Sequence, residues 1–226
     1  MIPLVLLAGM NCTAALWQGC GLDDALTPAL DQPSMDAQVA ALLARLPETF
    51  ILGGQSLGGI VAMALAAAAP ERVRGLLLVS TNAKAPTSAQ QDSWGVWIDR
   101  IDAGVTPGTL QAGIIDLLLS PRALADPALV ARAVAMGDAT SPATLRTQLS
   151  MQTTRTDLRE RLGGVPVPAL VVAGAQDALC PPSFHTEIAE RLPHARAVTL
   201  DGGHLLPLER PSAFGELVDG WRARLS

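Results

Sequence analysis

The sequence predicts an α/β protein with a doubly wound, mainly parallel sheet of about six strands and a helical cap insertion. Towards both ends of the 226-residue chain, short apolar runs alternate with segments of helical periodicity. This alternation is typical of β-α-β units in a parallel sheet covered on both faces. Between residues 82 and 162 strand-like runs are missing and only helical patterns occur. We therefore expect a core of residues 1–81 and 163–226 and a cap or lid of residues 82–162.

The first part of the chain contains three convincing strands and three helical segments. Residues 2–8 form a continuous apolar run, as expected of a strand buried on both faces, and a short helix should end near Trp17. Residues 22–30 contain at most a poor strand. Residues 34–46 have apolar side chains at helical spacing behind a capping Ser34. A strand at 50–53, a helix at 57–69 that Pro70 ends, and a strand at 73–80 follow.

The middle and the end of the chain differ in character. Helical patterns cover residues 92–101, 109–119, 127–136 and 142–153, with Pro, Gly, Ser and Thr between them. Alternation then returns, with strands at 169–173 and 195–200 and helices at 182–192 and 212–225. In open parallel sheets the ligand binds at the carboxyl ends of the strands. We expect the cap to lie over that edge.

Composition excludes several classes of protein. With 49% apolar and 16% charged residues the chain should be compact, and a net charge of −5 argues against a nucleic-acid partner. No run approaches the about 18 apolar residues of a membrane helix, and residues 2–8 lack the basic flank of a signal peptide. We expect a cytoplasmic protein without a membrane partner. Neither a disulfide framework nor a metal site is predicted, because the cysteines and histidines are few and scattered: Cys12, Cys20, Cys180, His185, His194 and His204.

The segment Gly54-Gln55-Ser56-Leu57-Gly58 fits the G-x-S-x-G pattern of a nucleophile elbow. An apolar strand precedes it and an alanine-rich helix follows it, which is the context that this motif requires. A serine on such a tight turn projects its hydroxyl away from the backbone, and the glycines let strand and helix pass closely. The start of the following helix can offer N–H groups to a developing oxyanion. Ser56 is therefore the candidate nucleophile, against an ordinary glycine-rich turn.

A serine nucleophile needs a base and an acid that orients the base. His204 is the best base, because it follows the last strand on a loop that two glycines free. His185 lies in a helical pattern and His194 at a helix end, and we interpret both as surface or helix-terminal residues. Asp177 is the best acid, since it lies in the loop directly after the 169–173 strand. Asp201 and Glu209 are weaker alternatives.

Two backbone N–H groups should form the oxyanion hole, one from Leu57 and one from Met10 in the loop after the first strand. The substrate pocket should draw on this loop, the cap and the histidine loop. We expect it to include Asn11, Trp94, Trp97, Met136, Met151 and Leu205, although core packing of the cap is the better explanation for each of its members in the cap. Acidic and basic residues are balanced within the cap, so no charged substrate is singled out.

These motifs together resemble the α/β-hydrolase superfamily over nearly the whole chain except the cap. Residues 54–58 resemble its elbow, residues 171–177 its acid loop, residues 202–211 its histidine loop and residues 6–11 its oxyanion loop. The order Ser56, Asp177, His204 is the family's order. Many members carry His-Gly or Pro-Gly in the oxyanion loop, where this chain has Ala8-Gly9. The match begins at what resembles the family's third strand, so we expect the first antiparallel hairpin to be lacking.

The resemblance implies acyl transfer without a metal or organic cofactor. The expected reaction is hydrolysis of a small or medium carboxylic ester, with thioesters or lactones also possible substrates. One alternative is lyase or enol-lactonase chemistry, as in the menaquinone-pathway carboxylate synthase. Another is a non-catalytic ligand receptor on the same fold. A serine at the elbow argues against the dehalogenase pattern, in which an aspartate attacks.

Overall fold

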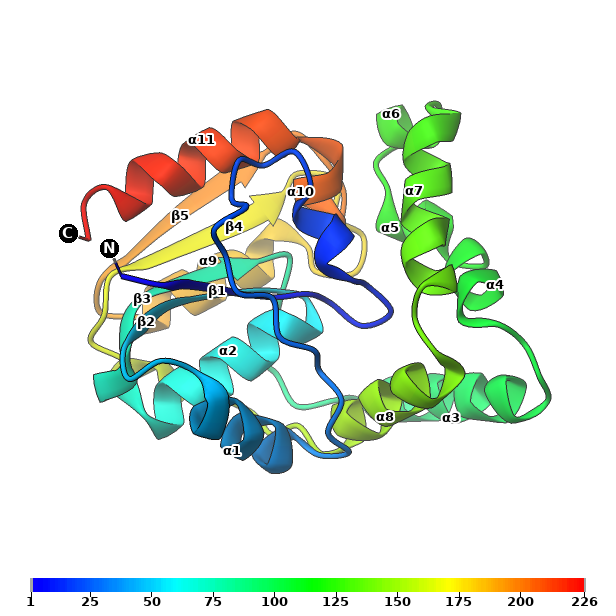
Figure 1. Cartoon of the computed structure of the whole chain (residues 1–226), viewed down its shortest axis with the longest axis horizontal. Coiled ribbons are helices and arrows are strands. Elements are labelled where there is room, and N and C mark those ends of the chain that lie inside the picture. Colours follow the sequence, from blue (N-terminus) through cyan, green and yellow to red (C-terminus); the bar gives the residue numbers. More distant parts are fainter. Residues whose placement is uncertain (1, 226) are drawn as a thin grey trace.

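The computed structural model describes residues 2–225, and its centre is a parallel sheet of five strands in the order β1-β2-β3-β4-β5 (Figure 1). Each strand is a short apolar run whose side chains are mostly buried, apart from the half-exposed last strand. The strands are β1 (Leu4–Leu7), β2 (Phe50–Gln55), β3 (Val73–Val79), β4 (Ala169–Gly174) and β5 (Ala195–Leu200). The α/β class and the parallel sheet expected from the sequence are confirmed.

The weak strand expected within residues 22–30 is reduced to one parallel bridge between Val5 and Leu26. The Leu6 N–H donates to the Leu26 carbonyl, and the Leu26 N–H donates to the Leu4 carbonyl, both over 2.8 Å. Pro28 has no N–H to extend the ladder. Leu26 pairs with one edge of β1, and the chain then crosses over to form β2 along the opposite edge of β1. The switch point of the sheet therefore lies between β1 and β2. Ligand sites of open α/β sheets lie at such a point.

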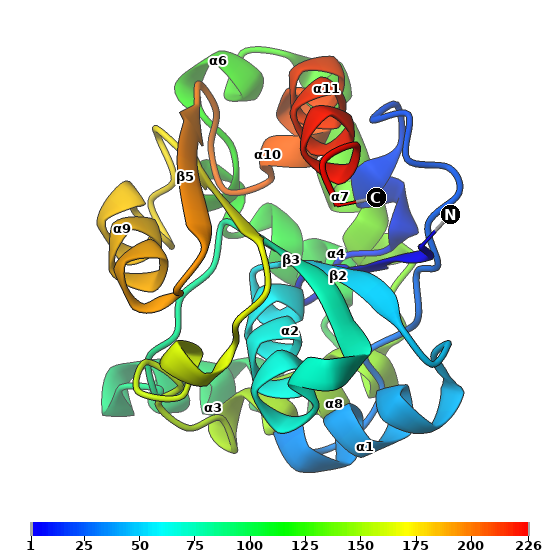
Figure 2. The same ribbon diagram turned by 90° about the vertical axis from the view of Figure 1, so that its left-hand side faces the viewer.

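Helices cover both faces of the sheet (Figures 1 and 2). Alternate side chains of β1 enter two separate apolar clusters, one on each face. Helices α1 (Met35–Arg45), α2 (Leu57–Ala68) and α9 (Pro182–Arg191) contribute to the first cluster. The second contains side chains of the 3-10 helix η1 (Ala14–Trp17), α10 (Leu206–Glu209) and α11 (Pro211–Arg222).

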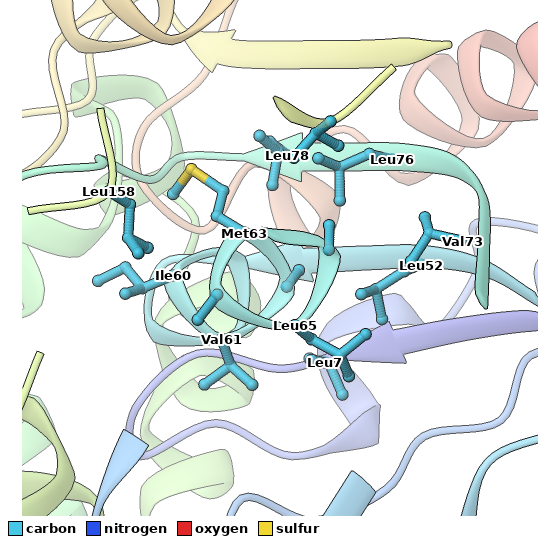
Figure 3. Packing of buried hydrophobic residues seen from close by; sticks show 14 of the residues in the cluster. Leu7, Leu52, Ile60, Val61, Met63, Leu65, Val73, Leu76, Leu78 and Leu158 are labelled. Carbon is cyan, nitrogen blue, oxygen red and sulfur yellow. The ribbon is translucent and has the colours of Figure 1, made fainter. Parts of the chain in front are cut away.

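Helix α2 carries the residues that follow the candidate nucleophile, and it is the most deeply buried helix of the core. Its sequence is apolar almost all round, which is expected of a helix enclosed by protein. Figure 3 shows Met63 and Leu65 of α2 among Leu52 of β2 and Leu76 and Leu78 of β3. This packing holds α2 against β2 and β3.

The chain between β3 and β4 forms helices, and no strand occurs in this described segment; helices α3 to α8 are called the cap below for their place in the fold. A serine, threonine or aspartate is the N-cap of each α-helix in this segment except α5. The single helix expected at 109–119 is divided, because α4 ends before Gly113 and α5 begins after it. The helices are α3 (Ser88–Asp102), α4 (Pro107–Ala112), α5 (Ile115–Leu118), α6 (Pro121–Leu124), α7 (Pro127–Asp138) and α8 (Pro142–Thr153). Within residues 2–225, no helix is long and apolar enough to cross a membrane.

Candidate active site

Ser56 lies at the sharp turn between β2 and α2, as the motif predicts. Its backbone has φ 51° and ψ −117°, a conformation that non-glycine residues rarely adopt. A Cβ on Gly54 would lie 2.2 Å from the carbonyl oxygen of Gly58, and a Cβ on Gly58 would lie 2.1 Å from that of Leu7. The two glycines are thus required for the close crossing of strand and helix that holds Ser56 in this strained turn.

His204 and Asp177 form a buried pair at the ends of neighbouring segments. The His204 Nδ1 lies 3.0 Å from each carboxylate oxygen of Asp177, and the two residues are only 3% and 4% exposed. The N–H groups of Leu179 and Cys180 also donate to Asp177 Oδ1. Burial raises the pKa of Asp177, but the charge and hydrogen bond of His204 and the two backbone donors outweigh it, so the pKa is lower than usual. An ionised Asp177 favours the His204 tautomer that carries its proton on Nδ1, with the lone pair on Nε2.

The two rival carboxylates have other partners. Asp201 pairs with Arg210, and its side chain is 65% exposed. Glu209 accepts hydrogen bonds from the Gly203 N–H and from the N–H and hydroxyl of Ser120. Glu209 therefore ties the histidine loop to the cap, whereas Asp177 alone of the three contacts the His204 ring.

Ser56 and His204 line the same cavity, which has a volume of about 260 Å³ and lies between the core and the cap. The structure forms no hydrogen bond between the hydroxyl of Ser56 and the ring of His204, both of which are described. Catalytic hydrogen bonds often tighten only when substrate binds. The candidate nucleophile, base and acid therefore lie at one edge of the sheet.

Gln55, the residue before the candidate nucleophile, was not singled out in the sequence. Its Nε2 donates to the backbone carbonyl of His204 over 3.0 Å, and its side chain is fully buried. A Cβ on Gly9 would lie 2.3 Å from Gln55 Oε1. Gln55 thus fills the space between the oxyanion loop and the histidine loop.

His185 is buried, which corrects the expectation of a surface or helix-terminal residue. It is 2% exposed, and its Nε2 accepts a hydrogen bond from the Thr81 N–H over 3.0 Å. The Thr81 hydroxyl in turn donates to the Ser56 carbonyl over 2.8 Å. Burial lowers the pKa of His185, so the ring is neutral and its Nδ1 proton faces the Pro181 carbonyl. His185 therefore supports the turn at Ser56 through Thr81.

The loop after β1 is fastened to the cap through Asn11. This residue has φ 58°, in the left-handed region that asparagine tolerates. Its backbone N–H donates to Gln148 Oε1, and its Nδ2 donates to the Pro107 carbonyl and to Gln111 Oε1, each over 2.9 Å. Helices α4 and α8 therefore fix the position of the neighbouring Met10, which lines the cavity with Asn11.

Four of the expected pocket residues line this cavity: Asn11, Trp94, Trp97 and Leu205. Met136 and Met151 do not, because they are buried in the two core clusters, 2% and 0% exposed. Helical periodicity placed them on an apolar face without indicating which neighbour that face meets. The structure adds polar residues that the sequence analysis missed, namely Gln90, Gln111, Gln152 and Arg155. In the described residues no cluster could hold a metal ion, and the three cysteines are unbridged.

A family model described as alpha/beta hydrolase fold matches residues 1–211. The chain belongs to this family. The α/β hydrolase is 29% identical to a pimeloyl-[acyl-carrier protein] methyl ester esterase of Yersinia enterocolitica, over 95% of this chain and 91% of the relative. Esterases are thus among its relatives, and the chain is an enzyme of the hydrolase class.

Solved structures give the same fold. A thermophilic esterase from Thermogutta terrifontis superposes with a TM-score of 0.89 at 22% identity, covering all of this chain and 90% of the other. An enol-lactonase from Burkholderia xenovorans gives 0.84 at 20% identity, covering 99% and 92%. At these identities the likeness concerns the fold alone. The chemistry of this α/β hydrolase must therefore be argued from its own residues.

Proposed function

We propose that this α/β hydrolase cleaves small or medium carboxylic esters through an acyl-enzyme intermediate on Ser56. The observation that carries the proposal is the buried pair of His204 and Asp177, whose histidine lines the same cavity as a serine on a strained turn. An oriented imidazole beside a serine is the arrangement that turns a weak hydroxyl into a nucleophile. The esterase relatives support the same reaction class.

In the proposed mechanism, His204 Nε2 takes the proton of Ser56 as its oxygen attacks the ester carbonyl. Asp177 stabilises the imidazolium that forms. The N–H groups of Met10 and Leu57 stabilise the tetrahedral oxyanion, a contribution of about 3 kcal/mol for one donor in comparable enzymes. His204 then protonates the leaving alcohol and activates water, which releases the acid and restores Ser56.

The cavity supports a substrate of limited size. Its volume of about 260 Å³ lies just below the usual range of small-molecule pockets. Trp94 and Trp97 of α3 and Leu117 and Leu118 of α5 give part of the wall an apolar surface. We therefore propose an acyl group of a few carbons, which the cap encloses.

Lactone opening is the second candidate, because it uses the same nucleophile, base and oxyanion donors on a cyclic ester. Lyase chemistry that relies on the same three side chains is a further candidate, which the experiment below can indicate. A receptor without catalysis is disfavoured. Asp177 is an ionised carboxylate buried behind His204, and burying a charge costs free energy. Ligand binding alone does not require such a buried charge.

Hydrolysis of p-nitrophenyl acetate and butyrate tests the proposal. The protein should turn over at least one of these esters, and Ser56→Ala should abolish that turnover and the labelling by a fluorophosphonate. Ser212→Ala is the matched control, because this exposed serine lies on α11 away from the cavity. Labelling of Ser56 without ester turnover would favour lactonase or lyase chemistry. If the protein shows no ester turnover and Ser56 is not labelled, the enzymatic assignment of Ser56 is overturned.

A further inference from the structure

Arg155 is a buried cation on the wall of the candidate active site. It follows α8 directly and is 5% exposed, and it lines the cavity that contains Ser56. Its Nη1 donates to Gln152 Oε1 over 2.9 Å and its Nη2 to Gln90 Oε1 over 3.0 Å. The guanidinium carbon lies 5.3 Å from the centre of the Trp94 ring. Neutral groups therefore hold the guanidinium in place at the cavity.

No carboxylate among the described residues pairs with Arg155, although other arginines of the cap region are paired. Arg146 contacts Asp102, and Arg159 contacts two carboxylates. The Nε of Arg155 is buried without any hydrogen-bond partner. An isolated charge buried in protein is costly unless an opposite charge and hydrogen bonds compensate it. The unmet N–H group and the missing counter-charge point to an anion that comes from outside the chain.

The cavity favours that anion. Its described lining contains no aspartate or glutamate, and Arg155 is its single lysine or arginine. The side-chain amides of Gln90 and Gln152 lie beside the guanidinium and can add neutral donors. One planar guanidinium matches the two oxygens of a carboxylate, whereas phosphate groups are commonly recognised by clusters of arginines. A single negative charge is the best match.

We propose that Arg155 binds a free carboxylate of the substrate, so that the preferred ester is a half-ester of a short dicarboxylic acid. This inference rests on the proposed ester hydrolysis at Ser56, and it adds the chemical class of the acyl group. Ser56 and Arg155 face one cavity of about 260 Å³, so only a few carbons can separate the ester from the carboxylate. The site is not evident from the sequence, because the acidic and basic residues of the whole cap balance. Only one of the cap's arginines, Arg155, lines the cavity.

Paired substrates test the inference. Mono-p-nitrophenyl glutarate carries the carboxylate, and p-nitrophenyl hexanoate is a neutral ester of similar length. We expect the ratio of their kcat/KM values to favour the glutarate, and to fall by about 10- to 100-fold in Arg155→Met, as for a lost charge-assisted hydrogen bond. Arg155→Lys should retain part of the preference. Arg146→Met, an exposed arginine on α8 outside the cavity, should keep the ratio of the unaltered protein.

A binding experiment separates this inference from the proposed reaction. In the Ser56→Ala background, glutarate should raise the Tm more than its neutral dimethyl ester does, and Arg155→Met should remove the difference. If esters are not cleaved but this shift depends on Arg155, ester hydrolysis fails and the carboxylate site stands. If esters are cleaved at Ser56 without preference for glutarate, the carboxylate site is wrong. A larger rise in Tm with methyl phosphate than with glutarate would overturn the assignment of a carboxylate. This comparison uses the unaltered protein, so it remains valid even if Arg155→Met does not fold.

Discussion

The side chain of Gln55 is hydrogen-bonded to the backbone of His204, 149 positions later in the chain, over 3.0 Å. The residue before the candidate nucleophile therefore holds the loop that carries the candidate base. Neither residue is accessible to water to any great extent, with exposures of 0% and 3%. A buried hydrogen bond of this kind can couple the positions of two segments that the sequence does not connect.

Replacing Gln55 by methionine should lower kcat more than it changes KM. Methionine has a similar shape, but it leaves the His204 carbonyl without this donor, and an unmet buried acceptor costs about 1–3 kcal/mol. We expect kcat to fall about tenfold or more, because the imidazole loses its fixed position relative to Ser56. Steady-state kinetics with p-nitrophenyl butyrate measure this split. Gln91→Met, at an exposed position of α3, is the control. A lower Tm with unchanged kcat would show that Gln55 acts on stability alone.

Replacing Asp177 by asparagine should remove most of the activity. The amide cannot stabilise the imidazolium, and its NH2 group favours the wrong His204 tautomer, a change that costs about 10⁴ in kcat in serine proteases. Asp201→Asn is the matched control, because this carboxylate is exposed and pairs with Arg210. Comparable losses in both variants would contradict the assignment of Asp177 as the acid.

Much of the fold could be predicted because buried parallel strands are mostly apolar runs, and four of the five strands stand out in this way between helices. The segment around Leu26 was harder, since one bridge at the edge of a sheet needs little apolar pattern. The division of the 109–119 segment depended on Gly113, whose effect on a helix is modest and is decided by packing.

The candidate nucleophile, base and acid could be predicted because each follows a strand, and the ends of parallel strands meet at one edge. His185 and Arg155 could not. A histidine inside a helical pattern and an arginine just after a helix are usually solvated, and only tertiary contacts bury them here. For Met136 and Met151 the prediction was wrong in the opposite direction. Each lies on an apolar helix face that packs into the core and does not line the cavity.

Replacing Gly58 by alanine should destabilise the protein by at least about 2 kcal/mol, as expected of overpacking against rigid backbone. The added Cβ would lie 2.1 Å from the Leu7 carbonyl oxygen, so β1 and α2 would have to separate. Gly95→Ala is the matched control. Nothing lies within 4 Å of a Cβ there, and alanine in this helix should stabilise by about 0.5–1 kcal/mol. Urea unfolding measures both. Equal stabilities would show that the elbow tolerates a wider crossing.

The stability of the protein should fall as the pH drops below about 6.5, and His185 should cause part of this fall. Burial lowers the pKa of His185, as does the charge of His204, whereas the Pro181 carbonyl and Asp177 oppose the shift. The folded state thus binds a proton on His185 less readily than the unfolded state. By linkage this stabilisation is complete above the ordinary pKa of about 6.5 and declines as the pH falls towards the lowered value.

Protonation of His185 would also place an N–H of the ring against the N–H of Thr81, whose hydroxyl holds the Ser56 carbonyl. His185→Gln keeps a polar side chain that does not titrate, so its free energy of unfolding should change less between pH 7 and pH 5 than that of the unaltered protein. Urea unfolding at several pH values measures the difference. His194→Gln, at an exposed position on the loop before β5, is the control. An unchanged slope in His185→Gln would mean that other groups carry the acid sensitivity.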